Sequence, residues 1–172
     1  MSVCVRADFF SPEQILDSGQ CFRMTRLENG RIQVLAGARR TELEQTAAGV
    51  LFHCTEAEYE TFWKSYFDLE ADYGAYADKI NSRDDFLRRA AQYGRGVRIL
   101  RQEPWEMIVT FLISQQNNIK RIRRCIEALC ERYGAPVYDG GDAEPLFRRR
   151  SSWRGRASRR CGRWGWATAA AT

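Results

Sequence analysis

The sequence has few of the features that mark membrane, secreted or metal-binding proteins. It contains no run of eighteen apolar residues, and its first residues have no apolar signal-peptide segment, so we expect an intracellular protein. There is a single histidine, His53, and the six cysteines form no Cys-x-x-Cys pair. These spacings predict no metal site and indicate reduced, mostly buried thiols.

Acidic residues are absent from one end of the chain. Residues 148–172 contain eight arginines and no aspartate or glutamate. Residues 1–147 contain 19 basic and 22 acidic residues, so the net charge of +5 arises entirely from residues 148–172. If residues 1–147 bind nucleic acid, they must therefore do so through a local basic patch.

Residues 148–172 also lack apolar periodicity and helix caps. One interpretation is a solvated basic tail that binds nucleic acid electrostatically, although its three tryptophans are unusual for a disordered segment. The other is translation in a shifted reading frame, because the codons of 164–168 permit Gly-Leu-Gly-Tyr-Arg when read from the third base. We favour the shifted frame and expect the evolved sequence to end near Phe147.

Residues 21–54 show the alternation of antiparallel strands. Asn29-Gly30 is a strong hairpin signal between two alternating segments, and Ala47-Ala48-Gly49 marks a second turn. With the apolar residues near the start of the chain, the pattern predicts a small antiparallel sheet of about five strands.

Helical signals follow the predicted sheet. Thr55 and Glu58 have the spacing of a capping box, which predicts a helix through about Tyr66. A second helix is expected over 66–76, and a third from Ser82 to Tyr93. Paired carboxylates such as Asp84-Asp85 and Glu103/Glu106 are better explained by capping and solvation than by acid–base catalysis.

Two further helices are predicted beyond residue 100. Pro104 opens a segment through Ser114 that is apolar nearly all round, which predicts a central buried helix. Residues 119–132 place Arg and Lys on one face, end near Gly134, and have an apolar face of Ile119, Ile122, Ile126, Leu129 and Cys130. Strands first and helices after predict an α+β fold, with a β domain over 1–81 and the start of a helical domain over 82–147.

Four carboxamides, Gln115 to Asn118, separate the last two predicted helices. Carboxamides can read base edges, and the start of the second helix, with four cations nearby, favours a phosphate: Lys120, Arg121, Arg123 and Arg124. An extruded nucleotide also leaves hydrogen bonds that short polar groups can replace. The alternative is that these amides only cap and bridge the helices.

Gly19 precedes the first long predicted strand. A glycine at this position permits a positive φ or a close backbone approach, and an ordinary turn is the simpler explanation.

Five segments together resemble the 8-oxoguanine DNA glycosylase family of the helix-hairpin-helix superfamily. They occur in the family's order and spacing, and they are SGQCFR (18–23), YFDL (66–69), GVRILRQEPWE (96–106), FLISQQNNIKRI (111–122) and LCERYG (129–134). The resemblance implies a β domain like half of a TATA-binding protein, followed by helical regions that clasp DNA.

The resemblance also implies the activity and its partners. A family member bends double-stranded DNA containing oxidised guanine, flips the damaged base and cleaves its N-glycosidic bond. A lysine attacks C1′ to form a Schiff base, which permits strand cleavage, and a downstream aspartate assists. No metal or organic cofactor is implied, and we expect a monomer in a bacterial-type cytoplasm or nucleoid.

Site residues follow by motif position. Gly19 corresponds to the glycine whose carbonyl accepts the N7–H of 8-oxoguanine, and Arg121 to the arginine that contacts the cytosine left behind. Asn117 and Asn118 match the last two residues of an Asn-Asn-Asn loop. Gln116 replaces the first, which fills the vacated space, so the preference for the opposite base is open.

The implied nucleophilic lysine and the aspartate have no counterpart in the sequence. Its only lysines, Lys64, Lys79 and Lys120, stand outside the required motif. We therefore expect a truncated, inactive N-terminal portion of an N-glycosylase/abasic-site lyase. Two alternatives remain: a non-catalytic DNA-binding module that uses the β domain and the basic tail, and a sister glycosylase for alkylated bases, which the Gly19 motif disfavours.

Overall fold

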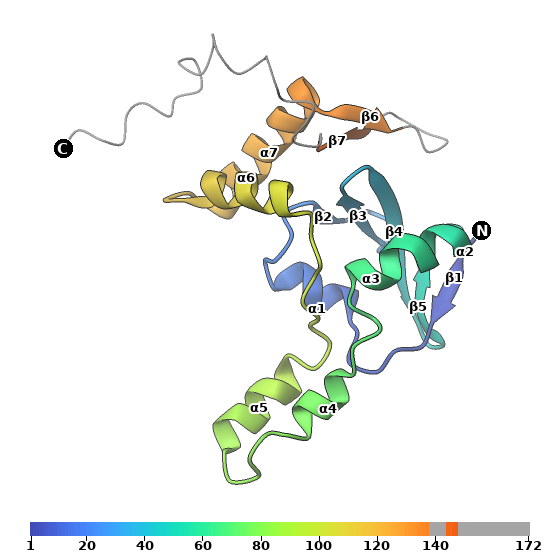
Figure 1. Cartoon of the computed structure of the whole chain (residues 1–172), viewed down its shortest axis with the longest axis vertical. Helices are drawn as coiled ribbons and strands as arrows, with labels where there is room; N and C mark the ends of the chain where they lie inside the picture. Colours follow the sequence, from blue (N-terminus) through green and yellow to red (C-terminus); the bar gives the residue numbers. More distant parts are fainter. Residues whose placement is uncertain (138–143, 148–172) are drawn as a thin grey trace, which may run out of the picture.

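The computed structural model describes residues 1–137 and 144–147, and its order of elements confirms the predicted α+β class (Figure 1). Five strands form one antiparallel sheet in the order β1-β5-β4-β3-β2. Their bounds are Val3–Val5, Met24–Arg26, Ile32–Ala36, Arg39–Thr46 and Gly49–Phe52 for β1 to β5. The alternating region predicted as strands begins at Cys21, but β2 begins only at Met24, so Cys21 to Arg23 lie outside the sheet.

Both predicted turns are confirmed. Gly30 has a φ of +83° between β2 and β3, a conformation that costs a glycine little. Gly49 has a φ of +140°, and a Cβ there would lie 2.4 Å from the carbonyl oxygen of Val5. The second turn therefore requires glycine for its backbone conformation and for the close approach of β1.

The main core lies between the sheet, helix α1 (Pro12–Asp17), which is inserted between β1 and β2, and the helix that follows β5. Helix α1 contributes Ile15, and the helix after the sheet contributes Trp63 and Tyr66. These side chains pack on Phe52 and Phe67, and Trp63, Phe52 and Phe67 have no exposed surface. Removing this apolar surface from water is the main stabilising contribution in this part of the chain.

The predicted capping box is present at the start of the helix that follows β5. Thr55 Oγ1 accepts from the Glu58 backbone N–H at 3.2 Å, and the Glu58 carboxylate accepts from the Thr55 N–H at 3.0 Å. The Thr55 N–H, and next the Thr55 hydroxyl, which donates to the same carboxylate at 2.8 Å, lower the pKa of Glu58. The helix runs as α2 (Glu56–Glu58), a π-helical turn η1 (Tyr59–Trp63) and α3 (Lys64–Tyr66), which confirms its predicted end at Tyr66.

The second helix prediction is wrong, and the third is confirmed in its end at Tyr93 but not in its cap. The chain does not continue as a helix over 66–76, because Asp68 has a positive φ of 52° and Asp72 begins a separate helix α4 (Tyr73–Ala77). Helix α5 (Asp85–Tyr93) is capped by Asp84, whose carboxylate accepts from the Leu87 N–H at 2.9 Å, and not by Ser82. Helices α4 and α5 lie apart from the sheet (Figure 1).

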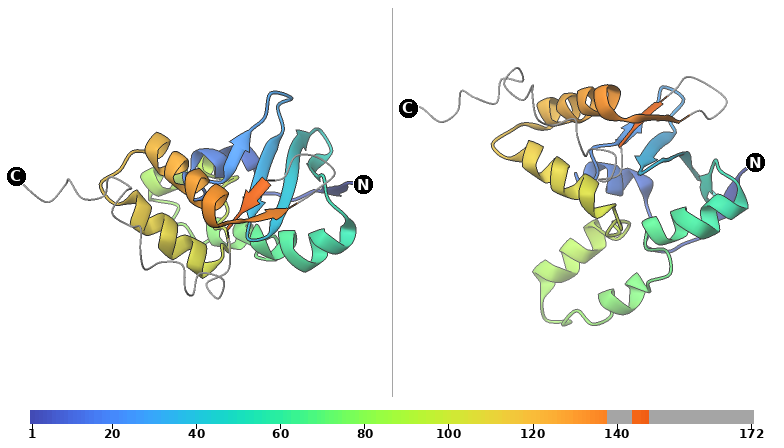
Figure 2. Two further views of the ribbon diagram at one scale, coloured as in Figure 1. Left: turned by 90° about the horizontal axis from the view of Figure 1, so that it is seen from above. Right: turned by 45° about the horizontal axis from the view of Figure 1, so that its top comes forward.

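Helices α6 (Pro104–Ser114) and α7 (Ile119–Tyr133) pack against each other beside the β2 end of the sheet (Figure 2). Glu103 caps α6 and Gly134 ends α7, as predicted. A short hairpin follows, with β6 at Ala135–Val137 and β7 at Glu144–Leu146. Within the described residues, no helix is both long and apolar enough to span a membrane.

The predicted burial of α6 on all sides is wrong. Only Glu106, Thr110 and Ile113 of this helix are fully buried and Trp105 and Val109 are half-buried. Its remaining large apolar side chains are exposed: Met107, Ile108, Phe111 and Leu112. Ile119, which was placed on the apolar face of α7, is 59% exposed. The two helices bury one face each, centred on Ile113 and on the Ile122 row.

The described cysteines agree with the prediction of reduced and mostly buried thiols. Cys21, Cys54 and Cys130 are buried, Cys125 is half-buried and Cys4 is exposed. Burial raises the pKa of Cys130 to about 11, so its thiol is protonated and unreactive at neutral pH. Cys161 and the whole predicted tail over 148–172 lie outside the described residues.

Candidate nucleic-acid interface

Gly19 lies in an exposed loop that joins α1 to β2, and it has a φ of +73°. Of the two possibilities that the sequence left open, a positive φ and a close backbone approach, the structure shows the first. No heavy atom lies within 4 Å of the position a Cβ would take, so the conformation, and not crowding, requires glycine. The carbonyl of this residue therefore belongs to a segment that is open to a ligand.

Gln20 fixes this loop to the strand-like segment that leads into α6. Its side-chain amide donates to the Arg98 carbonyl at 2.9 Å and accepts from the Leu100 N–H at 3.1 Å. Its own carbonyl accepts from Gln102 Nε2 at 2.8 Å. No residue near Gln20 in the sequence indicates this role, because its three partners lie about eighty residues away along the chain.

A buried polar cluster ties the same loop to α6 and the sheet. Arg23 and Glu106 are 8% and 6% exposed, and the positive charge of Arg23 acts on the Glu106 carboxyl group. Burial raises the pKa of Glu106, while Arg23 and the Gly37 backbone N–H oppose that rise. Glu106 is thus held between the loop and the sheet, which is a structural role that capping alone did not predict.

Arg98 connects two further segments, a role that no neighbouring sequence signal indicated. It is 4% exposed and donates to the carbonyls of Asp8, Phe9, Asp68 and Ala71 at 2.6 to 3.2 Å. Its guanidinium also lies 4.5 Å from the centre of the Tyr73 ring. Burial lowers the pKa of Arg98, but an arginine remains charged at any ordinary pH. Arg98 therefore holds the segment that leads into α6 against the residues just before α1 and the turn after α3.

The four carboxamides occupy the turn between α6 and α7, and most of them serve the backbone. Asn118 caps α7, with its side-chain oxygen accepting from the Arg121 N–H at 3.0 Å. Asn117 donates to the Ile113 carbonyl at 3.0 Å and Gln115 to the Phe111 carbonyl at 3.3 Å. For these three residues, the alternative in which amides cap and bridge helices describes the structure.

Gln116 differs from its neighbours. It has a φ of +50°, which is uncommon for a residue with a side chain, and it is exposed. Among the described residues, its amide has no hydrogen-bond partner. A strained backbone that presents a free amide group is the type of feature that accumulates at ligand-binding sites.

The start of α7 carries positive charge that carboxylates do not neutralise. Lys120, Arg121 and Arg124 are exposed, and none of them forms an ion pair within residues 1–137 and 144–147. The partial positive charge of the helix N-terminus adds to theirs. This end of α7 is therefore suited to a phosphate group.

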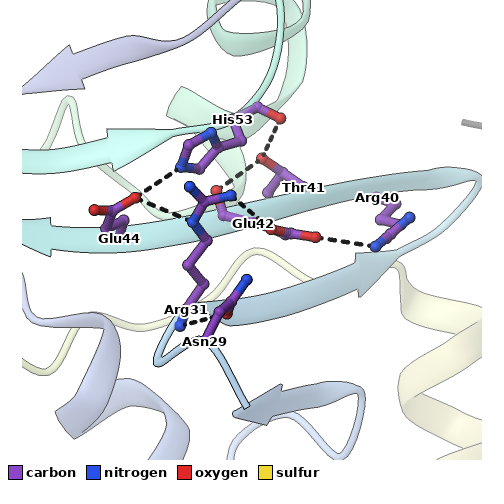
Figure 3. A network of polar contacts seen from close by, with 7 residues as sticks. All are labelled: Asn29, Arg31, Arg40, Thr41, Glu42, Glu44 and His53. Atoms are coloured by element: carbon purple, nitrogen blue, oxygen red, sulfur yellow. Dashed lines mark hydrogen bonds and ion pairs between the residues drawn. The ribbon is translucent and has the colours of Figure 1, made fainter. Parts of the chain in front are cut away.

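The solvent face of the sheet is different, because its cations are paired (Figure 3). Arg31 contacts Glu44 at 3.1 Å and Glu42 at 3.3 Å, and Arg40 contacts Glu42 at 3.0 Å. His53 Nε2 lies 3.1 Å from the Glu44 carboxylate, and this hydrogen bond is the main cause that lowers the pKa of Glu44. This network offers little excess positive charge to a nucleic acid.

The two predicted features lie toward the two ends of α6. The Gly19 loop is bonded through Gln20 to residues just before the helix, and the amide turn follows its last residue. Eleven residues of α-helix span about 16 Å. Two hollows, one between α4 and α5 and one beside α1 and β4, are lined by neither feature, and the described residues contain no cluster suited to a metal ion.

Known proteins resemble this chain over most of its described residues. The model of the 8-oxoguanine DNA glycosylase N-terminal domain matches residues 2–108. An N-glycosylase/DNA lyase of Saccharomyces cerevisiae is 36% identical over 77 residues, which are 44% of this chain and 20% of that protein.

Solved structures match more of the chain. The apo form of the Clostridium acetobutylicum 8-oxoguanine glycosylase/lyase is 36% identical, with a TM-score of 0.80 over 86% of this chain and 52% of that one. The same enzyme with double-stranded DNA containing cytosine opposite 8-oxoguanine is 32% identical, with a TM-score of 0.76 over 87% and 54%. This chain thus spans about half the length of these structures and a fifth of the yeast relative.

Proposed function

Because this chain belongs to the 8-oxoguanine DNA glycosylase family, a family of DNA-repair glycosylases and lyases, we propose that it binds duplex DNA beside an oxidised guanine. The observation that carries this proposal is that, within residues 1–137 and 144–147, the Gln116 amide has no hydrogen-bond partner and three nearby cations on α7 have no ion pair. The first group enters the base stack, and the cations hold the flanking phosphates. The proposed boundaries at residues 81 and 147 and a bacterial-type nucleoid location remain predictions.

Gln116 fills the space left by the extruded nucleotide in this proposal. Its amide replaces hydrogen bonds that the orphaned base loses, which lowers the cost of extrusion. Arg121 lies in the first turn of α7 and is exposed, as Gln116 is. In this proposal it contacts the cytosine that remains in the duplex. Asn117 and Asn118 act indirectly, because their side chains hold the turn and the helix start that present Gln116.

Gly19 supplies recognition of the oxidised base. Its carbonyl accepts the N7–H that 8-oxoguanine has and guanine lacks, a hydrogen bond worth about 1 kcal/mol net. The bonds of Gln20 to residues 98–102 fix the direction of this carbonyl before DNA binds. Such preorganisation reduces the entropy lost on binding.

The 172-residue polypeptide by itself is proposed to lack the covalent step. Lys64 pairs with Glu60 at 2.9 Å, and Lys79 stacks near Tyr76, so both are engaged on helix surfaces. Lys120 is exposed beside the amide turn and is proposed to contact a phosphate. Within the described residues, no buried lysine lies close to Gly19.

Borohydride reduction of a mixture with an 8-oxoguanine·cytosine duplex tests this proposal. We expect no covalent protein–DNA adduct from the 172-residue polypeptide, because a Schiff base requires a positioned amine. The matched positive control is the Clostridium acetobutylicum enzyme under identical conditions. An adduct with this chain would show that one of its three lysines or its N-terminal amine is the nucleophile, and it would contradict the proposal.

The second candidate function is a DNA-binding module without damage preference that uses the sheet and the basic tail. The paired charges on the sheet argue against a role for that face. The two functions differ in one measurement, the ratio of affinities for 8-oxoguanine·cytosine and guanine·cytosine duplexes. A ratio near one that persists over a range of salt concentrations favours the second candidate.

A further inference from the structure

The Ser18 hydroxyl forms hydrogen bonds to residues on both sides of Gly19. It donates to the Ile15 carbonyl at 2.7 Å. It accepts from the Gln20 side-chain amide at 3.1 Å and from the Gln20 backbone N–H at 3.4 Å. A hydroxyl has one proton to donate and two lone pairs to accept with, so its whole hydrogen-bonding capacity is used. Because Ser18 is the C-cap of α1, these bonds join the end of that helix to the residue after Gly19.

Ser18 and the segment before α6 hold different parts of Gln20. The bonds to residues 98–102 involve the Gln20 side chain and its own carbonyl. Among the residues that the structure describes, only Ser18 accepts a hydrogen bond from the Gln20 backbone N–H. The peptide unit between Gly19 and Gln20 is therefore held directly by the Ser18 hydroxyl.

This peptide unit also carries the Gly19 carbonyl. The peptide bond is trans, so its carbonyl and its N–H point in opposite directions. An N–H directed at Ser18 therefore directs the Gly19 carbonyl away from Ser18. Within residues 1–137 and 144–147, no group donates a hydrogen bond to this carbonyl, so its lone pairs are available to a ligand.

The exposure of the loop makes the Ser18 bond important for the direction of the carbonyl. Gly19 is exposed, and no heavy atom lies within 4 Å of the position that a Cβ would take. Glycine adopts a wider range of backbone conformations than any other residue. Without the hydroxyl, neither packing nor a side chain at position 19 restrains rotation of this peptide unit.

We propose that Ser18 is a positioning residue for damage recognition, which fixes the Gly19–Gln20 peptide unit so that the Gly19 carbonyl is presented before DNA binds. This inference rests on the proposed function, in which that carbonyl accepts the N7–H of 8-oxoguanine. Guanine has a lone pair at N7 in place of the proton, so a carbonyl fixed in this direction attracts one base and repels the other. A carbonyl that rotates freely turns away from the guanine lone pair and discriminates less between the two.

Ser18→Ala in the 172-residue polypeptide tests the proposal by fluorescence anisotropy. The ratio of affinities for 8-oxoguanine·cytosine and guanine·cytosine duplexes should fall by about threefold or more, because one directed hydrogen bond is lost. A loss of stability alone would lower both affinities by the same factor and leave the ratio unchanged. Ser18→Thr should retain the ratio, because threonine keeps a hydroxyl that can bond a carbonyl three or four residues earlier.

Thr61→Ala is the matched control. Thr61 is exposed on the helix after the sheet, and its hydroxyl donates to the Ala57 carbonyl at 2.6 Å. Its replacement removes a similar local bond outside the Gly19 loop and should leave the ratio unchanged. In the free protein, the amide order parameter of Gln20 measured by NMR should fall from about 0.85 to below about 0.6 in Ser18→Ala. It should stay at the native value in Thr61→Ala.

The outcomes separate this inference from the proposed function. A native ratio above one that Ser18→Ala retains would overturn the role of Ser18 and leave recognition by Gly19 intact. An unchanged Gln20 order parameter in Ser18→Ala would also overturn it. A native ratio near one would contradict recognition by Gly19, and the role of Ser18 would be overturned with it.

Discussion

Replacing Arg98 by methionine is expected to lower the free energy of unfolding by about 3 kcal/mol or more, measured by urea denaturation followed through tryptophan fluorescence. Arg98 is almost fully buried and donates to four backbone carbonyls from two separate segments. Methionine retains much of the volume but leaves these acceptors without donors, and each unsatisfied buried polar group costs about 1 to 3 kcal/mol. Phe9 and Asp68, which have positive φ angles, would lose a group that holds them.

Arg101→Met provides the matched control, because Arg101 lies in the same segment and also contacts Asp68. Its guanidinium Nε is 2.8 Å from the Asp68 carboxylate, but its side chain is 65% exposed. Exposed ion pairs contribute about 0 to 1 kcal/mol, so this variant should unfold near the native midpoint. Equal losses in the two variants would show that Arg98 is not the buried link that the structure indicates.

Reversing the charge of Lys120, Arg121 and Arg124 together to glutamate is expected to weaken duplex binding by about 100-fold or more at low salt. Each of these side chains is exposed and without an ion pair in the described structure, so each can neutralise a DNA phosphate. The slope of log K against log salt should also fall in magnitude, because fewer counterions are released. Fluorescence anisotropy with a labelled 8-oxoguanine·cytosine duplex measures both quantities.

The control for net charge is a triple glutamate variant at Arg6, Lys79 and Arg83. These residues are exposed and lie on the β1 side and around α4, and their reversal changes the net charge by the same amount. A second comparison removes residues 148–172, which should weaken binding without changing any preference for the damaged base. If removal of this segment abolishes binding and reversal on α7 does not, the DNA-binding module that uses the tail is the better account.

Local chemistry in the sequence predicted many of the features that depend on near neighbours. The Asn29-Gly30 hairpin, the Thr55–Glu58 capping box and the start of α6 at Pro104 each rest on residues a few positions apart. Turn and cap preferences act at this range, so a single sequence is sufficient to place them. At Gly19 the sequence left a positive φ and a close backbone approach open, and only the coordinates distinguish them.

The errors arose where two local signals competed. Residues 66–76 contain good helix formers, but Asp72 can cap a new helix, and its carboxylate accepts from the Ala75 N–H at 3.0 Å. Ser82 and Asp84 are both suitable caps two residues apart, and the structure uses Asp84. Composition cannot decide between such alternatives, because the difference in energy is about 1 kcal/mol or less.

The burial of α6 could not be judged from its own sequence. Apolar residues on all sides indicate that a helix is covered on all sides, but the covering elements need not belong to the residues described. Likewise, nothing near Arg98 or Gln20 reveals their partners, which lie roughly thirty to ninety positions away. The sequence also could not distinguish the four amides of the turn. Gln115, Asn117 and Asn118 differ from Gln116 in their hydrogen bonds to the backbone, which only the structure shows.

Disulfide cross-linking to DNA most directly tests whether the turn at Gln116 enters the space left by the damaged nucleotide, next to the opposite cytosine. In a Cys4→Ser background, which removes the exposed thiol of β1, Gln116→Cys is combined with an 8-oxoguanine duplex that carries a tethered thiol on the opposite cytosine. We expect rapid cross-linking at position 116 and little with Thr25→Cys, an equally exposed position on β2. Efficient cross-linking at position 25 with none at 116 would place the DNA on the sheet and contradict the account.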